Sequence, residues 1–159
     1  MACPQGTNNL GQVNGIDACG LKGRFTSDVL LTSDKTWVLQ GGVFVGGDNK
    51  NNATFSIQPG TKIVGATGAD YLVISRGSKI MAEGTKAKPI VFTTANEMST
   101  NRGQWGGLVI NGNAPVNLPG GQGEGEGNTG VYGGSNPADN SGVLKYVRVE
   151  FAGYEITPD

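Results

Sequence analysis

The sequence predicts an all-β fold in which short strands stack in parallel to form a solenoid, and three observations support this prediction. Glycine accounts for 28 of the 159 residues, and no segment of helical length keeps an apolar period of about 3.6 residues. Short runs of β-branched and aromatic residues recur instead, each ended by Gly, Pro, Asn or Asp. A turn motif repeats between these runs, as expected when each coil buries its apolar face against the next.

The chain begins with a polar segment that we expect to cap the fold over residues 1–20. Cys3 and Cys19 flank a Gly- and Asn-rich stretch, and a disulfide between them would order it, since closing a loop of about 15 residues contributes roughly 3 kcal/mol. A disulfide implies an oxidising compartment. The alternative is two free thiols in a cytosolic protein.

The parallel stack is expected over residues 21–159, because residues 57–63 and 74–80 align at an offset of 17 residues with Gly at the same place. A weaker copy covers residues 38–44. Glycine suits a tight turn, which often needs positive φ. The alternative fold, an antiparallel β-sandwich, explains the strands but not the repeated turn. The inward-facing core ladder is predicted to comprise Phe55, Ile57, Ile63, Leu72, Ile74, Ile80, Ile90, Phe92, Leu108, Ile110, Val147 and Val149.

A Gly-rich loop interrupts the strands at residues 117–142, and in a solenoid such insertions often lie on the binding face. Glu124, Glu126 and Asp139 are candidate calcium ligands, because calcium takes about six to eight oxygen ligands. Their spacing does not match an EF-hand, so the alternative is a solvated loop. Tyr132 is the candidate for stacking on a ligand. No cofactor other than calcium is expected.

Composition excludes several classes of function. The net charge is −1 without any basic run, which argues against a partner with a phosphate backbone such as nucleic acid. No apolar stretch approaches the length of a transmembrane segment. The chain has no histidine, so a Ser-His-Asp triad, a histidine zinc site and a Cys-His pair are excluded.

Four blocks of sequence are specific in combination: TFSIQPGTKIVG, YLVISRGSKIMAEGTKAKPIVFTTA, WGGLVINGNAPVN and DNSGVLKYVRVEFAGYEI. They resemble a family of secreted bacterial surface proteins, often lipoproteins, over nearly the whole chain from about residue 21. The resemblance implies a right-handed parallel β-helix with an N-terminal cap, and an extracellular or outer cell-surface location in a bacterium. It implies no catalytic residues, because the family has none established.

We therefore expect a non-enzymatic structural or adhesive module of the cell surface. The resemblance also implies further coils beyond the end of this chain, so an uncovered last coil is expected to drive homo-oligomer or filament formation through the β-helix ends. A carbohydrate or another surface ligand is a second partner class.

Two alternative functions remain: a carbohydrate-active β-helix of the polysaccharide lyase or hydrolase type, and a calcium-stabilised ligand-binding module. Glycoside hydrolysis needs two carboxylates in one groove, and the predicted strands carry few acids. Arg76 and Arg148 could serve a lyase as the base, but both are expected at solvated outward positions.

Overall fold

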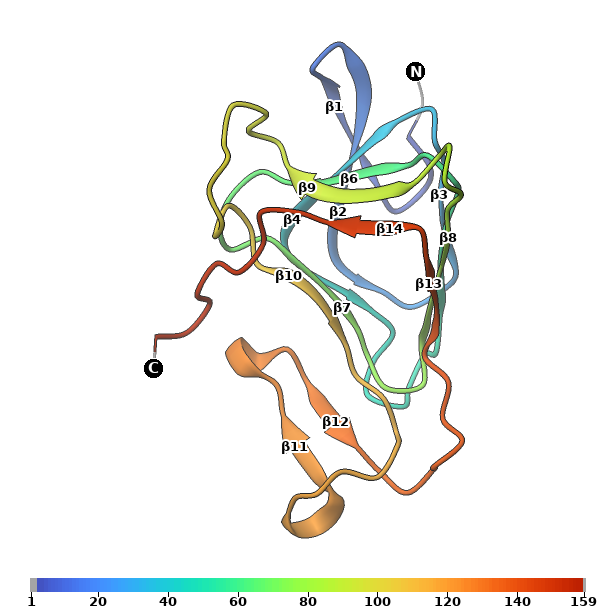
Figure 1. Ribbon diagram of the computed structural model, residues 1–159. Helices are drawn as coiled ribbons and strands as arrows, with labels where there is room; N and C mark the ends of the chain where they lie inside the picture. The colour runs from blue at the N-terminus through green and yellow to red at the C-terminus, as the bar shows by residue number, and fades with distance from the viewer. Residues whose placement is uncertain (1–2, 159) are drawn as a thin grey trace.

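Three sets of parallel strands pack against one apolar core in residues 3–158, the part of the chain that the computed structural model describes (Figure 1). The described residues are almost entirely β-strand, turn and loop, with two short 3-10 turns, Pro119–Gly121 and Glu126–Asn128. The strands are β1 Asn8–Val13, β2 Ile16–Phe25, β3 Val29–Leu31, β4 Thr36–Val45, β5 Thr54–Ile57, β6 Lys62–Gly65, β7 Tyr71–Ile74, β8 Lys79–Glu83, β9 Ile90–Thr94, β10 Gly107–Ile110, β11 Gln122–Glu124, β12 Val131–Gly133, β13 Gly142–Lys145 and β14 Val147–Val149.

The pairing of these strands is parallel along each set. One set contains β2, β4, β6, β9 and β14; a second joins β7 and β10 to the later half of β4; the third contains β3, β5, β8 and β13. β4 belongs to two sets because it turns at Gly41, whose φ is 72°. Among the described strands only β1–β2 and β11–β12 pair antiparallel. The prediction of a parallel all-β fold is confirmed, and the antiparallel sandwich is wrong.

The repeated turn motif marks corners of the chain rather than successive coils. Gly60 and Gly77 adopt the same positive φ, 81° and 85°, and the residue after each closes the same turn through its backbone N–H. Ile57 nevertheless pairs with Ala82, 25 residues later, whereas Ile74 pairs with Ile110 in another sheet. The predicted core ladder placed Ile57 and Ile74 above one another, and this part of the prediction is wrong. The offset of 17 residues separates two consecutive corners of the chain, and does not separate two stacked coils.

The core consists of aliphatic and aromatic columns that run across the paired strands. Trp37, Ile63 and Phe92 are neighbours in β4, β6 and β9, and all three are fully buried. Phe92 also stacks on the buried Trp105 at a ring-centroid distance of 6.4 Å. The predicted ladder residues from 55 to 92 are all buried.

The remaining predicted ladder residues lie in the last strands and are less covered. Leu108 and Val147 pack partly buried against the core, while Ile110 is 38% and Val149 50% exposed. Their strands, β10 and β14, have a parallel neighbour on one side within the described residues. Burial therefore falls toward this end of the stack.

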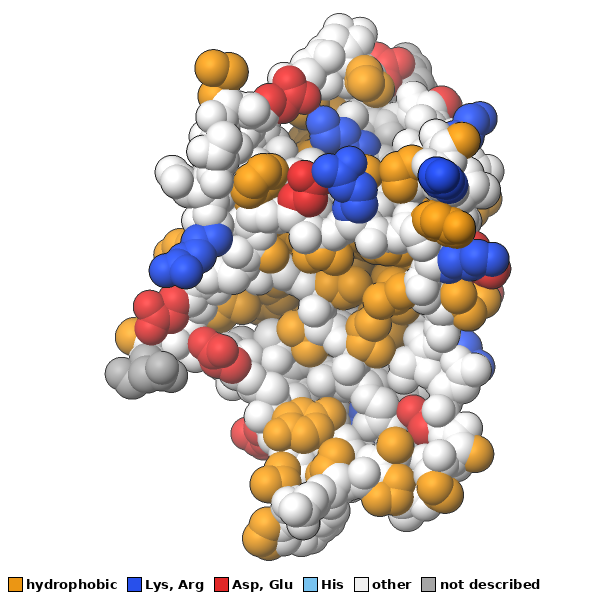
Figure 2. Space-filling view, in the orientation of Figure 1, with side chains coloured by type: hydrophobic (Ala, Val, Ile, Leu, Met, Phe, Trp, Pro, Cys, Tyr) orange, Lys and Arg blue, Asp and Glu red, His pale blue; other side chains and the backbone are white. Residues whose placement is uncertain are grey.

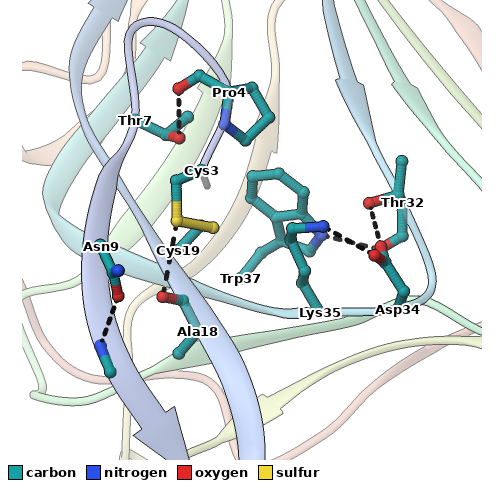
Figure 3. Close-up of a disulfide and its surroundings, with 11 residues drawn as sticks. Cys3, Pro4, Thr7, Asn9, Ala18, Cys19, Thr32, Asp34, Lys35 and Trp37 are labelled. Carbon is teal, nitrogen blue, oxygen red and sulfur yellow. Dashed lines mark hydrogen bonds and ion pairs between the residues drawn. A yellow bond between two sulfur atoms is a disulfide. The ribbon is translucent and has the colours of Figure 1, made fainter. Parts of the chain in front are cut away.

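The N-terminal end carries the predicted Cys3–Cys19 disulfide (Figure 3). Cys19 is fully buried and pairs with Trp37 across β2 and β4. β2 continues through residue 20 to Phe25, so the segment expected as a cap shares a strand with the stack. No helix in residues 3–158 is long and apolar enough to cross a membrane.

Candidate functional site

A groove with a volume of about 820 Å³ lies between β10, the Gly-rich insertion and the C-terminal tail, residues 150–158. Figure 1 shows the β11–β12 hairpin standing apart from the stack, beside β10. The volume lies within the range of about 300–1,000 Å³ that small-molecule sites occupy. The side chains that face it come from all three segments: Val109, Ile110 and Asn111 from and after β10, Glu126, Thr129 and Tyr132 from the insertion, and Tyr154, Glu155 and Ile156 from the tail.

A buried arginine attaches the hairpin to the stack. Arg76 is 6% exposed; its Nη1 donates to the carbonyl of Gly133 in β12 at 2.7 Å. Its other two nitrogens donate to the two carboxylate oxygens of Asp48, at 2.5 and 2.7 Å. The expected solvated position of Arg76 is therefore wrong, because these partners satisfy its donors inside the protein. The pKa of Asp48 is lowered by the hydrogen bond from Arg76, and the same bond raises the pKa of Arg76.

Amide side chains attach the segment before the insertion, and the turn of the hairpin, to the stack. Asn49 and Asn113 exchange reciprocal hydrogen bonds of 3.0 and 2.9 Å between their side chains. The buried Asn111 donates from Nδ2 to the carbonyl of Thr129 at 2.9 Å. The insertion that was expected to be a loop contains the β11–β12 hairpin, and the turn of this hairpin is tied to the end of β10 through Thr129.

The ring of Tyr132 lies across the backbone of the opposite strand. Tyr132 and Gly123 are partners in the β11–β12 ladder, and a Cβ at position 123 would stand 2.6 Å from both Cζ and Oη of Tyr132. Only glycine leaves room for the ring in this position. Tyr132, predicted as a ligand-stacking residue, does line the groove.

The tail forms the remaining wall. The N–H of Tyr154 donates to the carbonyl of Trp105 at 3.0 Å, and the N–H of Gly153 donates to the carbonyl of Gly106 at 3.2 Å. Ile156 then contacts both the stack and the insertion: a Cβ on Gly106 would lie 3.5 Å from its Cδ1, and one on Gly127 would lie 2.4 Å from its Cγ2.

Tyr154 and Glu155 also line the groove, but the sequence analysis did not predict either as a site residue. They follow the last strand, where the sequence shows an aromatic residue beside an acid. That pattern alone does not locate the tail, because its position depends on hydrogen bonds to residues almost fifty positions earlier in the chain.

The predicted calcium ligands are not brought together. Glu126 lines the groove and accepts a hydrogen bond from Thr157 at 3.3 Å. Asp139 instead accepts from the backbone N–H of Asn113 at 2.8 Å, while Glu124 lies in β11 outside the groove lining. Across residues 3–158, no three Cys, His, Asp or Glu side chains are grouped closely enough to hold a metal ion. Glu126 and Glu155 both line the groove.

A family model described as a pectate-lyase-like β-helix domain matches residues 23–159. No curated protein and no solved structure matches the chain. The family match overturns the expectation of a non-enzymatic structural or adhesive module, since it points to the carbohydrate-active alternative. The disulfide fits an extracellular location.

Proposed function

Because the chain belongs to the family of pectate-lyase-like β-helix domains, we propose that it is a carbohydrate-active protein that binds a saccharide chain in the groove beside β10. One observation carries the proposal: this groove gathers two tyrosines, Tyr132 and Tyr154, with two carboxylates, Glu126 and Glu155. A cleft with apolar and aromatic walls and a few polar groups is typical of small-ligand sites.

The groove residues suit distinct roles in sugar binding. Tyrosine offers an apolar ring face together with a hydroxyl group, so Tyr132 and Tyr154 can pack against the C–H faces of sugar rings. Glu126 and Glu155 can accept hydrogen bonds from sugar hydroxyl groups. Asn111 adds a buried polar side chain at the end of β10.

The same carboxylates are the candidate catalytic pair. In glycoside hydrolysis, one carboxylic acid protonates the oxygen of the leaving group, and the other carboxylate activates water or attacks the sugar. Glu126 comes from the insertion and Glu155 from the tail, so they reach the groove from different segments. Hydrolysis fits this lining better than elimination with a basic side chain, because no Lys or Arg is among the described residues that line it.

We include in this proposal a right-handed β-helix with a covered N-terminal end, and a location at the outer surface of a bacterium. The parallel pairing supports a right-handed solenoid whose N-terminal end is covered by the segment that the disulfide holds. An outer-surface location in a bacterium rests on the sequence resemblance and is consistent with the disulfide.

Affinity electrophoresis in gels containing a panel of soluble polysaccharides tests binding, and release of reducing ends tests hydrolysis. We expect at least one polymer to retard the wild-type protein, and we expect Tyr132→Ala to reduce that retardation. Tyr146→Ala is the matched control, since Tyr146 is 52% exposed and lies outside the groove lining.

Glu126→Gln and Glu155→Gln should each abolish the release of reducing ends, with Glu97→Gln as the control outside the groove. The proposal fails if no polymer retards the wild type, or if Tyr132→Ala and Tyr146→Ala bind equally.

A further inference from the structure

We infer that the saccharide bound in this groove is uncharged and is not a polyuronate such as pectate. The inference rests on the proposed function, because it names the substrate class of the same groove. Its basis is the charge of the lining: Glu126 and Glu155 face the groove, and no Lys or Arg does so among the described residues that line it.

A polyuronate carries one carboxylate on each sugar, so a site for it needs cationic partners. Arginine and lysine are the side chains that bind carboxylates through charge-assisted hydrogen bonds. Two exposed glutamates along the groove, Glu126 and Glu155, would instead repel such a chain, and added salt would weaken this repulsion.

The nearest buried cation is already engaged. Arg76 stands behind the hairpin, where Asp48 and the carbonyl of Gly133 take up three of its nitrogens. Figure 2 shows most Lys and Arg side chains of this face over the stacked strands, away from the hairpin. On this face most basic side chains therefore lie away from the hairpin, and Arg76, which reaches the groove wall at Gly133, already has its donors engaged.

A bound calcium ion could in principle bridge protein carboxylates to a uronate. This arrangement needs several protein oxygens around the ion, and residues 3–158 contain no group of three acidic or other metal-ligating side chains. The two groove carboxylates are better suited to hydrogen bonds with neutral hydroxyl groups.

The test compares neutral polysaccharides with polygalacturonate and alginate by affinity electrophoresis and isothermal titration calorimetry, each with calcium and with a chelator. We expect a neutral polymer to bind at least about tenfold more tightly than either polyuronate, a ratio worth about 1.4 kcal/mol. Binding of the neutral polymer should change little up to about 0.5 M sodium chloride, because screening weakens charge interactions alone. Calcium should not reverse the preference.

The double variant Glu126→Gln/Glu155→Gln supplies a second measurement. If the carboxylates exclude polyuronates, removing both charges should raise polyuronate affinity, whereas Glu83→Gln/Glu97→Gln, two acids outside the groove lining, should leave it unchanged. Wild-type preference for a polyuronate, or an unchanged polyuronate affinity in the groove double variant, overturns the inference alone. Failure of every polymer to bind overturns the proposed function as well.

Discussion

The guanidinium group of Arg76 holds both carboxylate oxygens of Asp48, 28 residues earlier in the chain, while its third nitrogen holds the hairpin through Gly133. A single side chain thus joins a corner loop of the stack to the wall of the groove. The planar guanidinium is suited to this task because its donors are fixed in a fork that matches a carboxylate.

Arg76→Gln is expected to lower the free energy of unfolding by about 1–3 kcal/mol, the range for losing hydrogen bonds to a charged group. Denaturation in urea measures the change. Arg148→Gln is the control, because Arg148 forms an exposed ion pair with Glu150 at 3.4 Å, and exposed pairs contribute less than about 1 kcal/mol. Equal losses in both variants would contradict the role of Arg76.

Acid should weaken the same contact. The Arg76 hydrogen bond lowers the pKa of Asp48 below its ordinary value of 3.8, so the folded protein binds this proton less readily than the unfolded chain. The stabilisation is complete above the ordinary pKa and is lost as pH falls through the lowered one.

Unfolding measured from pH 6 down to about pH 2 should therefore show a steeper loss of stability in the wild type than in Asp48→Asn. Asp34 also has a lowered pKa, through hydrogen bonds from Lys35 and Thr32. Asp34→Asn is a useful comparison because it leaves the Asp48 contribution in place. Parallel curves for the wild type and Asp48→Asn would refute this assignment.

The disulfide should stabilise the N-terminal end. Cys3 and Cys19 are separated by 16 residues, and a loop of that size is worth about 3 kcal/mol in the chain-entropy account. Cys3→Ala/Cys19→Ala should lower the melting temperature measured by circular dichroism. Reduction of the wild type should produce a similar fall, and reductant should not affect the double variant. An unchanged melting temperature after complete reduction would sink the prediction.

Gly123→Ala should impair saccharide binding by displacing the ring of Tyr132, since the added methyl group would meet that ring. We expect a loss of affinity in the same direction as for Tyr132→Ala, measured by affinity electrophoresis. Gly47→Ala is the matched control, because its nearest atom is a backbone oxygen at 3.3 Å in a turn outside the groove lining. A Gly123→Ala protein with wild-type binding would show that the ring position is unimportant.

Asp70 is expected to be the most sensitive acid for folding. Its carboxylate accepts backbone hydrogen bonds from Gly41 at 2.7 Å, Ala66 at 2.8 Å and Thr67 at 2.7 Å. Asp70→Asn replaces one acceptor oxygen with a donor and should cost about 2–3 kcal/mol in urea denaturation. Asp17 accepts only an exposed hydrogen bond from the side chain of Gln12 among those described, so Asp17→Asn should lower the free energy of unfolding far less. Similar losses in the two variants would count against the prediction.

The sequence was sufficient to predict the strands and the disulfide, because both leave local patterns. β-Branched runs ended by turn residues predict strands, and the glycines at 60 and 77 correctly predict identical corners. The period was misassigned because two corners of similar sequence, 57–63 and 74–80, lie on different edges of the stack. Similar turn residues recur wherever the chain must turn sharply, so a repeated turn motif does not by itself give the number of residues in each coil.

The site was predictable only in part. Tyr132 and Glu126 stand out in the Gly-rich insertion, and both line the groove. Glu155 was not predicted as a site residue, and Arg76 was expected in solvent. Their roles depend on partners far away in sequence, such as Gly133 for Arg76, and one sequence gives no local sign of such a pairing.

Ile156 touches the stack at Gly106 and the insertion at Gly127, so it works as a wedge between two parts of the molecule. Cleavage just before this residue by a protease would separate the wedge from the stack and leave the 3-10 turn at Glu126–Asn128 without its apolar support. A saccharide bound between Tyr132 and Tyr154 would contact both the insertion and the tail. Bound saccharide should therefore protect the last residues from digestion.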